Sequence, residues 1–294
     1  MGVDVVKSSA PGKPQLAQCV GQTFILAYKE DTATLASALT QAGLPCEVLR
    51  QVHQPGYDAY ARSYLCLLNH RAAWERAAQI TQPTLVVEAD FVPVQGMGRL
   101  PVSYNLADES FGIAWLYTCA PQVYRITEQG YGDGYSTAMV AYVITPRSAE
   151  VLLTYADQLA KQPGPTAYSP WDSGLDYYLR DRGFTNYVPF RNYGEHGGIS
   201  NPEHRKYVHR QRRLSGAHRA DVLYGPLSFL PPYAQTSAGT LSRWDYFQGR
   251  LYGRVKGLGR LFLGKYLRVP VLRSAEHPWP LAWFALRRQL TLRP

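Results

Sequence analysis

Residues 84–94 read TLVVEADFVPV, and this stretch decides the fold. Its apolar run, residues 85–87, is short and β-branched, as expected of a strand that is buried on both faces. The run ends in Glu88 and Asp90, and Pro93 then blocks further ladder pairing. We therefore predict a buried strand that finishes abruptly in two carboxylates.

The two carboxylates occupy alternate positions, so their side chains share one face of the chain. A buried charge is costly unless it is paired or bound to a metal, and ligand sites in open α/β sheets lie beyond the carboxyl ends of strands. Carboxylate oxygens suit Mg²⁺ and Mn²⁺. Glu88 and Asp90 are thus candidates for a divalent-metal site, and a solvated acidic turn is the alternative interpretation.

Strand and helix patterns alternate on both sides of this stretch, which is typical of a parallel sheet in an α/β protein. We expect strands at residues 22–28, 46–52, 111–117, 138–144 and 186–190. Helices are expected at residues 32–42, 57–80, 147–160 and 172–181. The Gly- and Tyr-rich segment 127–137 predicts a flexible loop.

The composition indicates a globular protein. The chain has 294 residues, of which 46% are hydrophobic and 18% charged, so it can bury one large core or two modest ones. Its four cysteines are scattered, which favours free thiols in a reducing compartment, with one disulfide as the alternative. We find neither a secretory signal pattern nor a membrane-spanning apolar run, and we expect a cytoplasmic protein or one attached peripherally to the inner face of the plasma membrane.

The net charge of +9 is confined to the end of the chain. From Arg243 onward there are eleven Lys or Arg and two Asp or Glu, whereas the preceding residues hold equal numbers of both signs. This division, together with composition, predicts a loose leader at 1–20, a catalytic domain at 21–240 and a basic extension at 241–294.

The extension has an amphipathic pattern. Apolar residues recur every three or four positions in segment 244–272, interleaved with Arg and Lys, although its glycines weaken a helix in water. We favour docking of residues 243–294 on an anionic membrane surface. The alternatives are a helix packed on the catalytic domain and a basic arm for nucleic acid, a partner we do not expect.

A second polar cluster occupies residues 191–205, RNYGEHGGISNPEHR. Gly197 and Gly198 allow backbone N–H groups to approach an anion closely. His196 or His204 could complete a metal shell begun by Asp90. An ordinary solvated loop is the alternative interpretation.

Four segments, in order, resemble glycosyltransferase family 25, the type that acts in lipopolysaccharide biosynthesis. CLLNHRAAW at 66–74 stands where the family has Gly-Cys-x-x-Ser-His-x-x-x-Trp, and LVVEADFVP stands where it has an acidic Leu-Glu-Asp-Asp motif. AYVITPRSAEVLL at 141–153 resembles its Ala-Tyr-x-Ile segment, and SPWD at 169–172 its Pro-x-Asp before a helix. Two positions depart from the family pattern: Asn69 replaces a serine and Ala89 replaces the middle acid.

The resemblance implies a GT-A-like, Rossmann-like single α/β domain with a central mixed, mostly parallel sheet. It implies inverting transfer of a hexose from a nucleotide-sugar, such as a UDP-sugar, to a glycan or lipid-linked glycan of a surface polysaccharide. Mn²⁺ or Mg²⁺ bridges the diphosphate in this chemistry. The implied metal ligand is Asp90, with Glu88 at the ribose or sugar.

The remaining site residues are assigned with alternatives. Inversion needs a general base, for which Asp172 and Glu195 are candidates; capping of a helix is the alternative role for Asp172. We also expect donor contacts from Tyr28 and Lys29, which follow a predicted strand, and from His70, for which packing inside its helix is the alternative.

Two other functions compete with a transferase. A metal-assisted phosphoesterase could use Glu88, Asp90 and His196, and a catalytically inactive transferase-like domain could bind a nucleotide or glycan, with Ala89 as a mark of decay.

Overall fold

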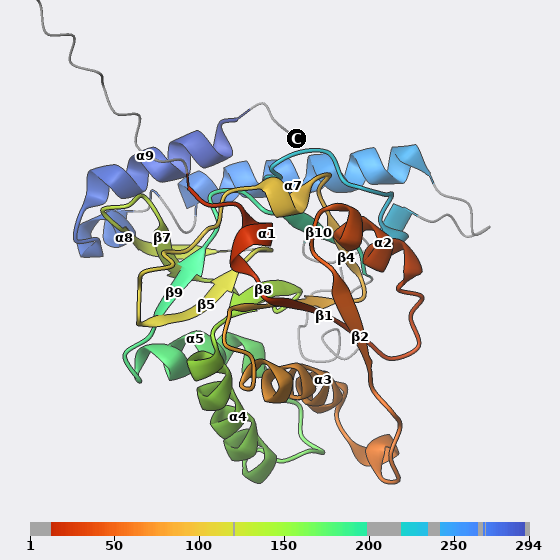
Figure 1. Ribbon diagram of the computed structural model, residues 1–294. Helices are drawn as coiled ribbons and strands as arrows, with labels where there is room; N and C mark the ends of the chain where they lie inside the picture. Colours follow the sequence, from red (N-terminus) through yellow and green to blue (C-terminus); the bar gives the residue numbers. More distant parts are fainter. Residues whose placement is uncertain are drawn as a thin grey trace, which may run out of the picture.

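The computed structural model describes residues 13–119, 121–198, 219–234, 242–263, 267 and 269–291. Its centre is an eight-stranded sheet with the order β2-β1-β3-β8-β5-β9-β7-β6 (Figure 1). Its strands are β1 (Gln22–Ala27), β2 (Cys46–Arg50), β3 (Thr84–Glu88), β5 (Phe111–Trp115), β6 (Gln122–Ile126), β7 (Gly132–Tyr135), β8 (Ala141–Ile144) and β9 (Thr185–Val188). Only β7 and β8 oppose the common direction of these strands. The predicted α/β class and its mixed, mostly parallel sheet are confirmed.

A two-stranded ribbon flanks this sheet and consists of β4 (Phe91–Pro93) and β10 (Gly194–His196). The described helices are α1 (Leu16–Cys19), α2 (Ala33–Gln41), α3 (Arg62–Ala77), α4 (Pro146–Lys161), α5 (Trp171–Arg180), α7 (Arg243–Leu263), α8 (Val269–Ser274) and α9 (Pro278–Gln289). Single 3₁₀ turns are η1 (Tyr57–Ala59), η2 (Met97–Arg99) and η3 (Pro232–Ala234). In Figure 1, α3, α4 and α5 lie below the sheet, and α7 and α9 lie above it.

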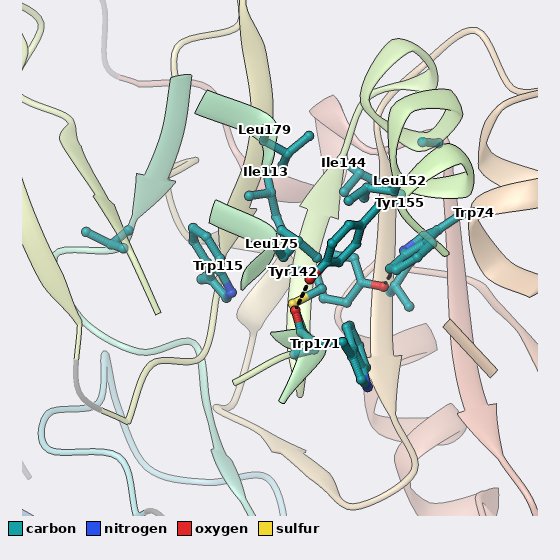
Figure 2. Packing of buried hydrophobic residues seen from close by; sticks show 14 of the residues in the cluster. Trp74, Ile113, Trp115, Tyr142, Ile144, Leu152, Tyr155, Trp171, Leu175 and Leu179 are labelled. Carbon is teal, nitrogen blue, oxygen red and sulfur yellow. Dashed lines mark hydrogen bonds between the residues drawn. The ribbon is translucent and has the colours of Figure 1, made fainter. Parts of the chain in front are cut away.

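Alternation along the strands divides the core into two clusters. Val86 belongs to the first cluster, to which α3, α4 and α5 contribute side chains. Its neighbours Leu85 and Val87 belong to the second cluster, to which α2 contributes. This is the period-2 pattern of a strand that is buried on both faces. Figure 2 shows part of the first cluster, in which the ring of Trp171 lies near the hydrogen-bonded pair of Trp74 and Tyr142.

Local sequence explains where α4 begins. Thr145 accepts a hydrogen bond from the backbone N–H of Ser148 at 3.1 Å, and Ser148 bonds back to the N–H of Thr145 at 3.0 Å. Pro146 occupies the first turn, where its missing N–H costs no hydrogen bond. The predicted start at Arg147 is therefore one residue late.

The segment predicted as a flexible loop and the second polar cluster both contain a strand. Within 127–137, residues 132–135 form β7, and a Cβ at Gly134 would lie 2.1 Å from the carbonyl oxygen of Gln122 on β6. The glycine therefore permits close strand pairing and does not make the segment flexible. Within 191–205, residues 194–196 form β10, while residues 199–205 lie outside the described residues.

The leader and the extension are both partly packed. Of the predicted loose leader, residues 1–12 lie outside the described residues, but Leu16 in α1 is fully buried. In the extension, Leu261 of α7 and Leu281, Phe284 and Ala285 of α9 join the first core cluster. The extension therefore packs on the α/β domain, which was one of the alternatives for this segment.

Candidate metal and donor site

The candidate site lies where β3 ends and the chain turns into β4. Residue pairing between β1 and β3 places Leu26 beside Glu88, so both strands finish at the same edge of the sheet. The ribbon then brings in a distant segment, because His196 on β10 pairs with Phe91 on β4. Sheet pairing thus carries an imidazole to the acidic motif across more than a hundred residues of sequence.

Three side chains converge at this corner. Nε2 of His196 lies 2.9 Å from Oδ2 of Asp90. One ligand atom each from Glu88, Asp90 and His196 fall within 4.8 Å of one another. The Asp90 and His196 side chains are 31% and 18% exposed, so solvent reaches the group from one side.

Charge and burial act against each other on the Asp90–His196 pair. Burial alone would raise the pKa of Asp90, but the charge and hydrogen bond of His196, with Arg219 nearby, outweigh it and the pKa falls. Burial alone would lower the pKa of His196, but Asp90 outweighs it and the pKa rises. In the absence of metal, the two side chains therefore form an ion pair.

The chemistry of this group fits a divalent cation. Two carboxylates and an imidazole are ligands that Mn²⁺ accepts, whereas a thiolate-rich set would favour softer metals. In addition, Oδ1 of Asp90 is buried and accepts no hydrogen bond from the described residues. A buried carboxylate oxygen without a partner is costly, and a cation would satisfy it.

His70 holds Glu88 in place from the protein side. Its ring is fully buried on α3, with Nε2 3.1 Å from Oε1 of Glu88 and Nδ1 2.8 Å from the hydroxyl of Tyr142. Because Tyr142 also accepts a hydrogen bond from Trp74, its own proton can go to Nδ1, which leaves the Nε2 proton for Glu88. The packed role, the alternative interpretation of His70, is the one that these contacts favour, because its buried ring orients Glu88; a donor contact by His70 stays a prediction.

Gly197 and Gly198 serve a close contact with Asp90. The N–H of Gly197 donates to the carbonyl oxygen of Asp90 at 2.7 Å, so it is already used and does not cradle an anion. A Cβ on Gly198 would lie 1.9 Å from Oδ2 of Asp90 and 3.1 Å from Nε2 of His196. Any larger residue here would require the Asp90 carboxylate or the backbone to move.

Asp172 lies beside the acidic motif. It sits in the first turn of α5, where Oδ1 accepts a hydrogen bond from the N–H of Ser173 at 2.9 Å. It also lines a pocket of about 100 Å³ together with Glu88 and Cys66. The structure thus brings Asp172 and Glu88 to one cavity while Asp172 also bonds to its own helix.

Cys66 adds little as a metal ligand. Its Sγ lies 3.8 Å from Oε1 of Glu88. Burial, followed by the neighbouring carboxylates Glu88 and Asp172, raises the pKa of its thiol, so the protonated form persists.

The remaining predicted site residues that the structure describes lie outside the group formed by Glu88, Asp90 and His196. Tyr28 and Lys29 follow β1 at the same sheet edge, with the Lys29 ammonium 4.8 Å from the Tyr28 ring centre and the Tyr28 side chain exposed. Glu195 is fully buried and paired with Arg250, so its carboxylate is not open to an acceptor hydroxyl. His204 lies outside the described residues.

Ala89 is explained by packing. Its N–H donates to the carbonyl oxygen of Leu26 at 2.9 Å, and its side chain packs against the second core cluster. Glu88, Asp90 and His196 form their group without a carboxylate at this position.

Two contributing residues are not signalled by the sequence. The buried Arg219 donates from Nη1 to the carbonyl oxygen of His196 at 2.6 Å and stacks on Tyr233, 3.4 Å from the ring centre. The ring of Tyr117 lies 5.9 Å from that of His196, and its buried hydroxyl has no hydrogen-bond partner among the described residues. Neither lies in a local pattern that signals a site, because both arrive through tertiary contacts.

Comparisons with known proteins find only distant likeness. No protein-family model matches the sequence, and no curated protein matches it. Among solved structures, the chain is similar to a glycosyltransferase involved in glycosylation of the major capsid of PBCV-1, with 12% identity and a TM-score of 0.37 over 57% of this chain and 80% of that one.

Two further neighbours are structures of Drosophila β1,4-galactosyltransferase 7. A variant in complex with manganese, UDP-Gal and xylobiose has 13% identity and a TM-score of 0.33, covering 63% of this chain and 74% of that one. The catalytic domain with xylobiose has 15% identity and a TM-score of 0.35, covering 67% and 78%. All three neighbours are glycosyltransferases, but TM-scores this low do not establish a shared fold.

Proposed function

We propose that this chain is a metal-dependent glycosyltransferase of GT-A-like fold that uses a nucleotide-sugar donor, with a UDP-sugar as the first choice. One observation carries the proposal: Glu88, Asp90 and His196 converge within 4.8 Å at the carboxyl edge of parallel strands, and one buried oxygen of Asp90 has no partner among the described residues. That edge is where α/β sheets bind ligands.

The residues match the charge of such a donor. A departing nucleoside diphosphate concentrates negative charge, which Mn²⁺ or Mg²⁺ stabilises when bound. Asp90 and His196 would hold the cation, and Glu88 would share it or accept a hydrogen bond from a ribose or sugar hydroxyl. Arg219, held by the carbonyl oxygens of His196 and Gly198, adds a positive charge near Asp90.

Asp172 is our choice of general base for an inverting transfer. It shares a pocket with Glu88, which would contact the donor. An acceptor hydroxyl in that pocket would therefore lie close to both the donor and the Asp172 carboxylate. Glu195 is set aside because it is buried and ion-paired. The finer assignment, to family 25 with a hexose donor and a lipopolysaccharide or other surface-glycan acceptor, follows from the sequence resemblance.

We further propose that the extension docks on an anionic membrane that presents a lipid-linked glycan acceptor. One face of α7 is apolar and mostly exposed, and we call it the apolar stripe. It is formed by the exposed Trp244, Phe247, Leu251, Val255 and Phe262 and the half-buried Leu258. The exposed Trp279 and Trp283 of α9 lie in the same basic extension. Aromatic residues beside cations favour the interface of an anionic bilayer. None of the described helices has the length and apolar character to span a membrane.

The competing functions gain less from the geometry. A two-metal phosphoesterase needs a second ligand set, but among the described residues the other candidate group, Cys66–His70–Glu88, shares Glu88. The thiol of Cys66 has a raised pKa, and both nitrogens of His70 are already bonded. An inactive binding domain is less favoured, because Glu88, Asp90 and His196 converge although residue 89 is an alanine.

The decisive experiment is a screen of UDP-sugars for UDP release with Mn²⁺, Mg²⁺ or EDTA, using wild type, Asp90→Asn and Asp172→Asn. Asp157→Asn, which changes an exposed carboxylate on α4, is the control. We expect Asp90→Asn to lose metal-dependent turnover by about a hundred-fold or more. Asp172→Asn should lose transfer but keep Mn²⁺-dependent UDP binding.

Each competing function has its own outcome in this experiment. Undiminished turnover of Asp90→Asn would contradict the metal site. Phosphate-ester hydrolysis without sugar transfer would indicate a phosphoesterase, and UDP binding without UDP release from any donor would indicate a binding domain.

A further inference from the structure

The carboxylate of Glu195 joins three segments of the chain. It is fully buried on β10, next in sequence to His196. Its Oε1 accepts hydrogen bonds from the N–H of His196 at 3.0 Å and from the N–H of Ala220 at 2.7 Å. Ala220 follows Arg219, so one carboxylate oxygen ties together the backbones that carry the imidazole and the guanidinium beside Asp90.

The counter-charge for this carboxylate comes from the C-terminal extension. Arg250 of α7 donates from Nη1 to Oε2 of Glu195 and also to the carbonyl oxygen of Ala220 at 2.9 Å. The side chains of Arg250 and Glu195 are only 7% and 0% exposed, so neither charge is compensated by bulk water.

Three glycines let α7 approach closely enough for this contact. A Cβ on Gly253 would lie 2.5 Å from the carbonyl oxygen of Ala220, and one on Gly257 would lie 2.7 Å from Cβ of Asp221. A Cβ on Gly249 would lie 2.7 Å from the ring of Tyr233, which itself stacks on Arg219. The glycine face of α7 therefore packs on the segment that carries Arg219 (Figure 1).

We propose that Arg250 is a positioning residue of the metal centre, which acts on His196 and Arg219 through the carboxylate of Glu195. Glu195 thereby receives a role other than general base, and the extension becomes part of the site's architecture. The inference rests on the proposed metal centre. Arg250 itself touches no ligand; it holds the backbone hydrogen bonds that aim the imidazole at Asp90.

The extension supplies a matched control pair. Arg288 of α9 donates from Nη2 to Oδ1 of Asp221 at 2.8 Å, and both side chains are buried. Asp221 accepts hydrogen bonds from Asn192 and Gln289, but no hydrogen bond of its carboxylate reaches His196. Loss of either arginine leaves a buried carboxylate without its cation, but only the loss of Arg250 affects the carboxylate that holds His196.

The test compares Arg250→Met with Arg288→Met in the full-length protein. Mn²⁺ affinity is measured by EPR of free Mn²⁺ at a temperature where circular dichroism shows both variants folded. We expect Arg250→Met to lose about ten-fold or more in affinity and Arg288→Met less than about two-fold. The double variant Arg250→Met/Glu195→Gln, which removes both charges and keeps an amide oxygen as acceptor, should recover part of the loss.

A readout without metal separates this inference from the metal centre itself. The backbone amide of His196 is followed by NMR in protein labelled with ¹⁵N-histidine, and the resonance is assigned through His196→Gln. We expect Arg250→Met to move this resonance and Arg288→Met to leave it in place. Equal Mn²⁺ affinities and an unmoved amide in both variants would overturn the positioning role. A wild type that binds no Mn²⁺ while Arg250→Met still moves the amide would instead overturn the metal centre and limit Arg250 to positioning the backbone.

Discussion

At the scale of single residues, the site depends on how closely the backbone passes Asp90. Gly198 has no side chain at the point where a methyl group would overlap the Asp90 carboxylate. The carboxylate is in turn bonded to His196, so a displacement of one ligand displaces the other. A glycine outside any family motif thus controls the geometry of two side chains.

Gly198→Ala should therefore weaken Mn²⁺ binding by about ten-fold or more, because the carboxylate or the backbone must move away from the added methyl group. Isothermal titration with Mn²⁺ measures the change. Gly225→Ala is the control, since a Cβ there meets nothing within 4 Å. Equal affinities of the two variants would show that the contact at Gly198 is unimportant for the metal.

The Asp90–His196 pair should make stability depend on pH in metal-free protein. The lowered pKa of Asp90 contributes stability that is present above about pH 4 and is lost as the pH falls through the folded-state pKa. The raised pKa of His196 contributes stability that is present below about pH 6.5 and is lost as the pH rises through its folded-state pKa. The ion pair is therefore most stabilising at mildly acidic pH.

His196→Gln should accordingly reduce the free energy of unfolding more at about pH 5.5, which lies inside this window, than at about pH 9, which lies above it. Urea unfolding in EDTA measures the difference, and His277→Gln, a change at an exposed residue, serves as the control. A loss of stability that is the same at both pH values would contradict the ion pair.

At the scale of elements, α7 carries two different faces. Its glycine face packs on residues 219–221 and Tyr233, whereas the apolar stripe faces solvent. By sequence alone the glycines are a weakness of the helix, but close approach to another backbone requires them. Their low helix propensity is offset by packing and by buried ion pairs.

Two glycines of α7 allow this to be tested within one helix. Gly253→Ala should destabilise the protein by about 1–3 kcal/mol, because its methyl group would lie 2.5 Å from the carbonyl oxygen of Ala220. The methyl group added by Gly259→Ala meets nothing within 4 Å. This substitution should instead stabilise the protein by about 0.5–1 kcal/mol, because alanine has a higher helix propensity than glycine. Thermal unfolding of both variants measures the difference. Stabilisation by both substitutions would mean that α7 does not pack closely on residue 220.

At the scale of the whole molecule, the extension cannot be removed without damage to the domain. Leu261, Leu281 and Phe284 belong to the first core cluster, and Arg250 and Arg288 form buried ion pairs with the domain. Deletion of residues 243–294 would therefore expose core and leave buried carboxylates unpaired, at a cost of about 3–5 kcal/mol for each broken pair. Membrane docking has to be tested with substitutions on the exposed stripe.

The triple variant Phe247→Ser/Val255→Ser/Phe262→Ser should lose co-sedimentation with vesicles that contain anionic phosphatidylglycerol, because its three apolar side chains are exposed and supply the buried area. Leu106→Ser/Tyr177→Ser removes exposed apolar groups elsewhere and should pellet like wild type. Wild type should dissociate at high salt, since the attraction between the exposed cations of the extension and anionic lipid is screened by salt; Arg250 and Arg288 are buried and take no part.

Two outcomes would contradict docking of the apolar stripe on a membrane. One is that wild type fails to pellet with anionic vesicles at low salt. The other is that light scattering shows wild type as a dimer and the triple variant as a monomer, which would assign the stripe to a second copy of the chain. The excess of positive charge argues against a dimer formed through the stripe, because the two basic extensions would repel each other.

Much of this architecture could be predicted from local pattern. The buried strand ending in Glu88 and Asp90, the alternation of strands and helices and the basic extension all depend on periodicity and composition within short windows. Parallel strands place their carboxyl ends at the same edge of a sheet, as β1 and β3 do here. Because α/β sheets bind ligands at that edge, the sequence pattern alone indicates a ligand site at the acidic motif.

Only the tertiary structure decided which residues complete that site. The pairing of β10 with β4 brings His196 to Asp90, and the packing of α7 turns Glu195 from a candidate base into the buried partner of Arg250. Burial, desolvation and contacts between distant segments determine these roles. The sequence pattern names His196 as one of two candidate partners for Asp90, but it does not reveal Arg219, Tyr117 or the burial of Glu195. A single sequence shows the spacing of its residues but not which distant segments will share their low-dielectric surroundings.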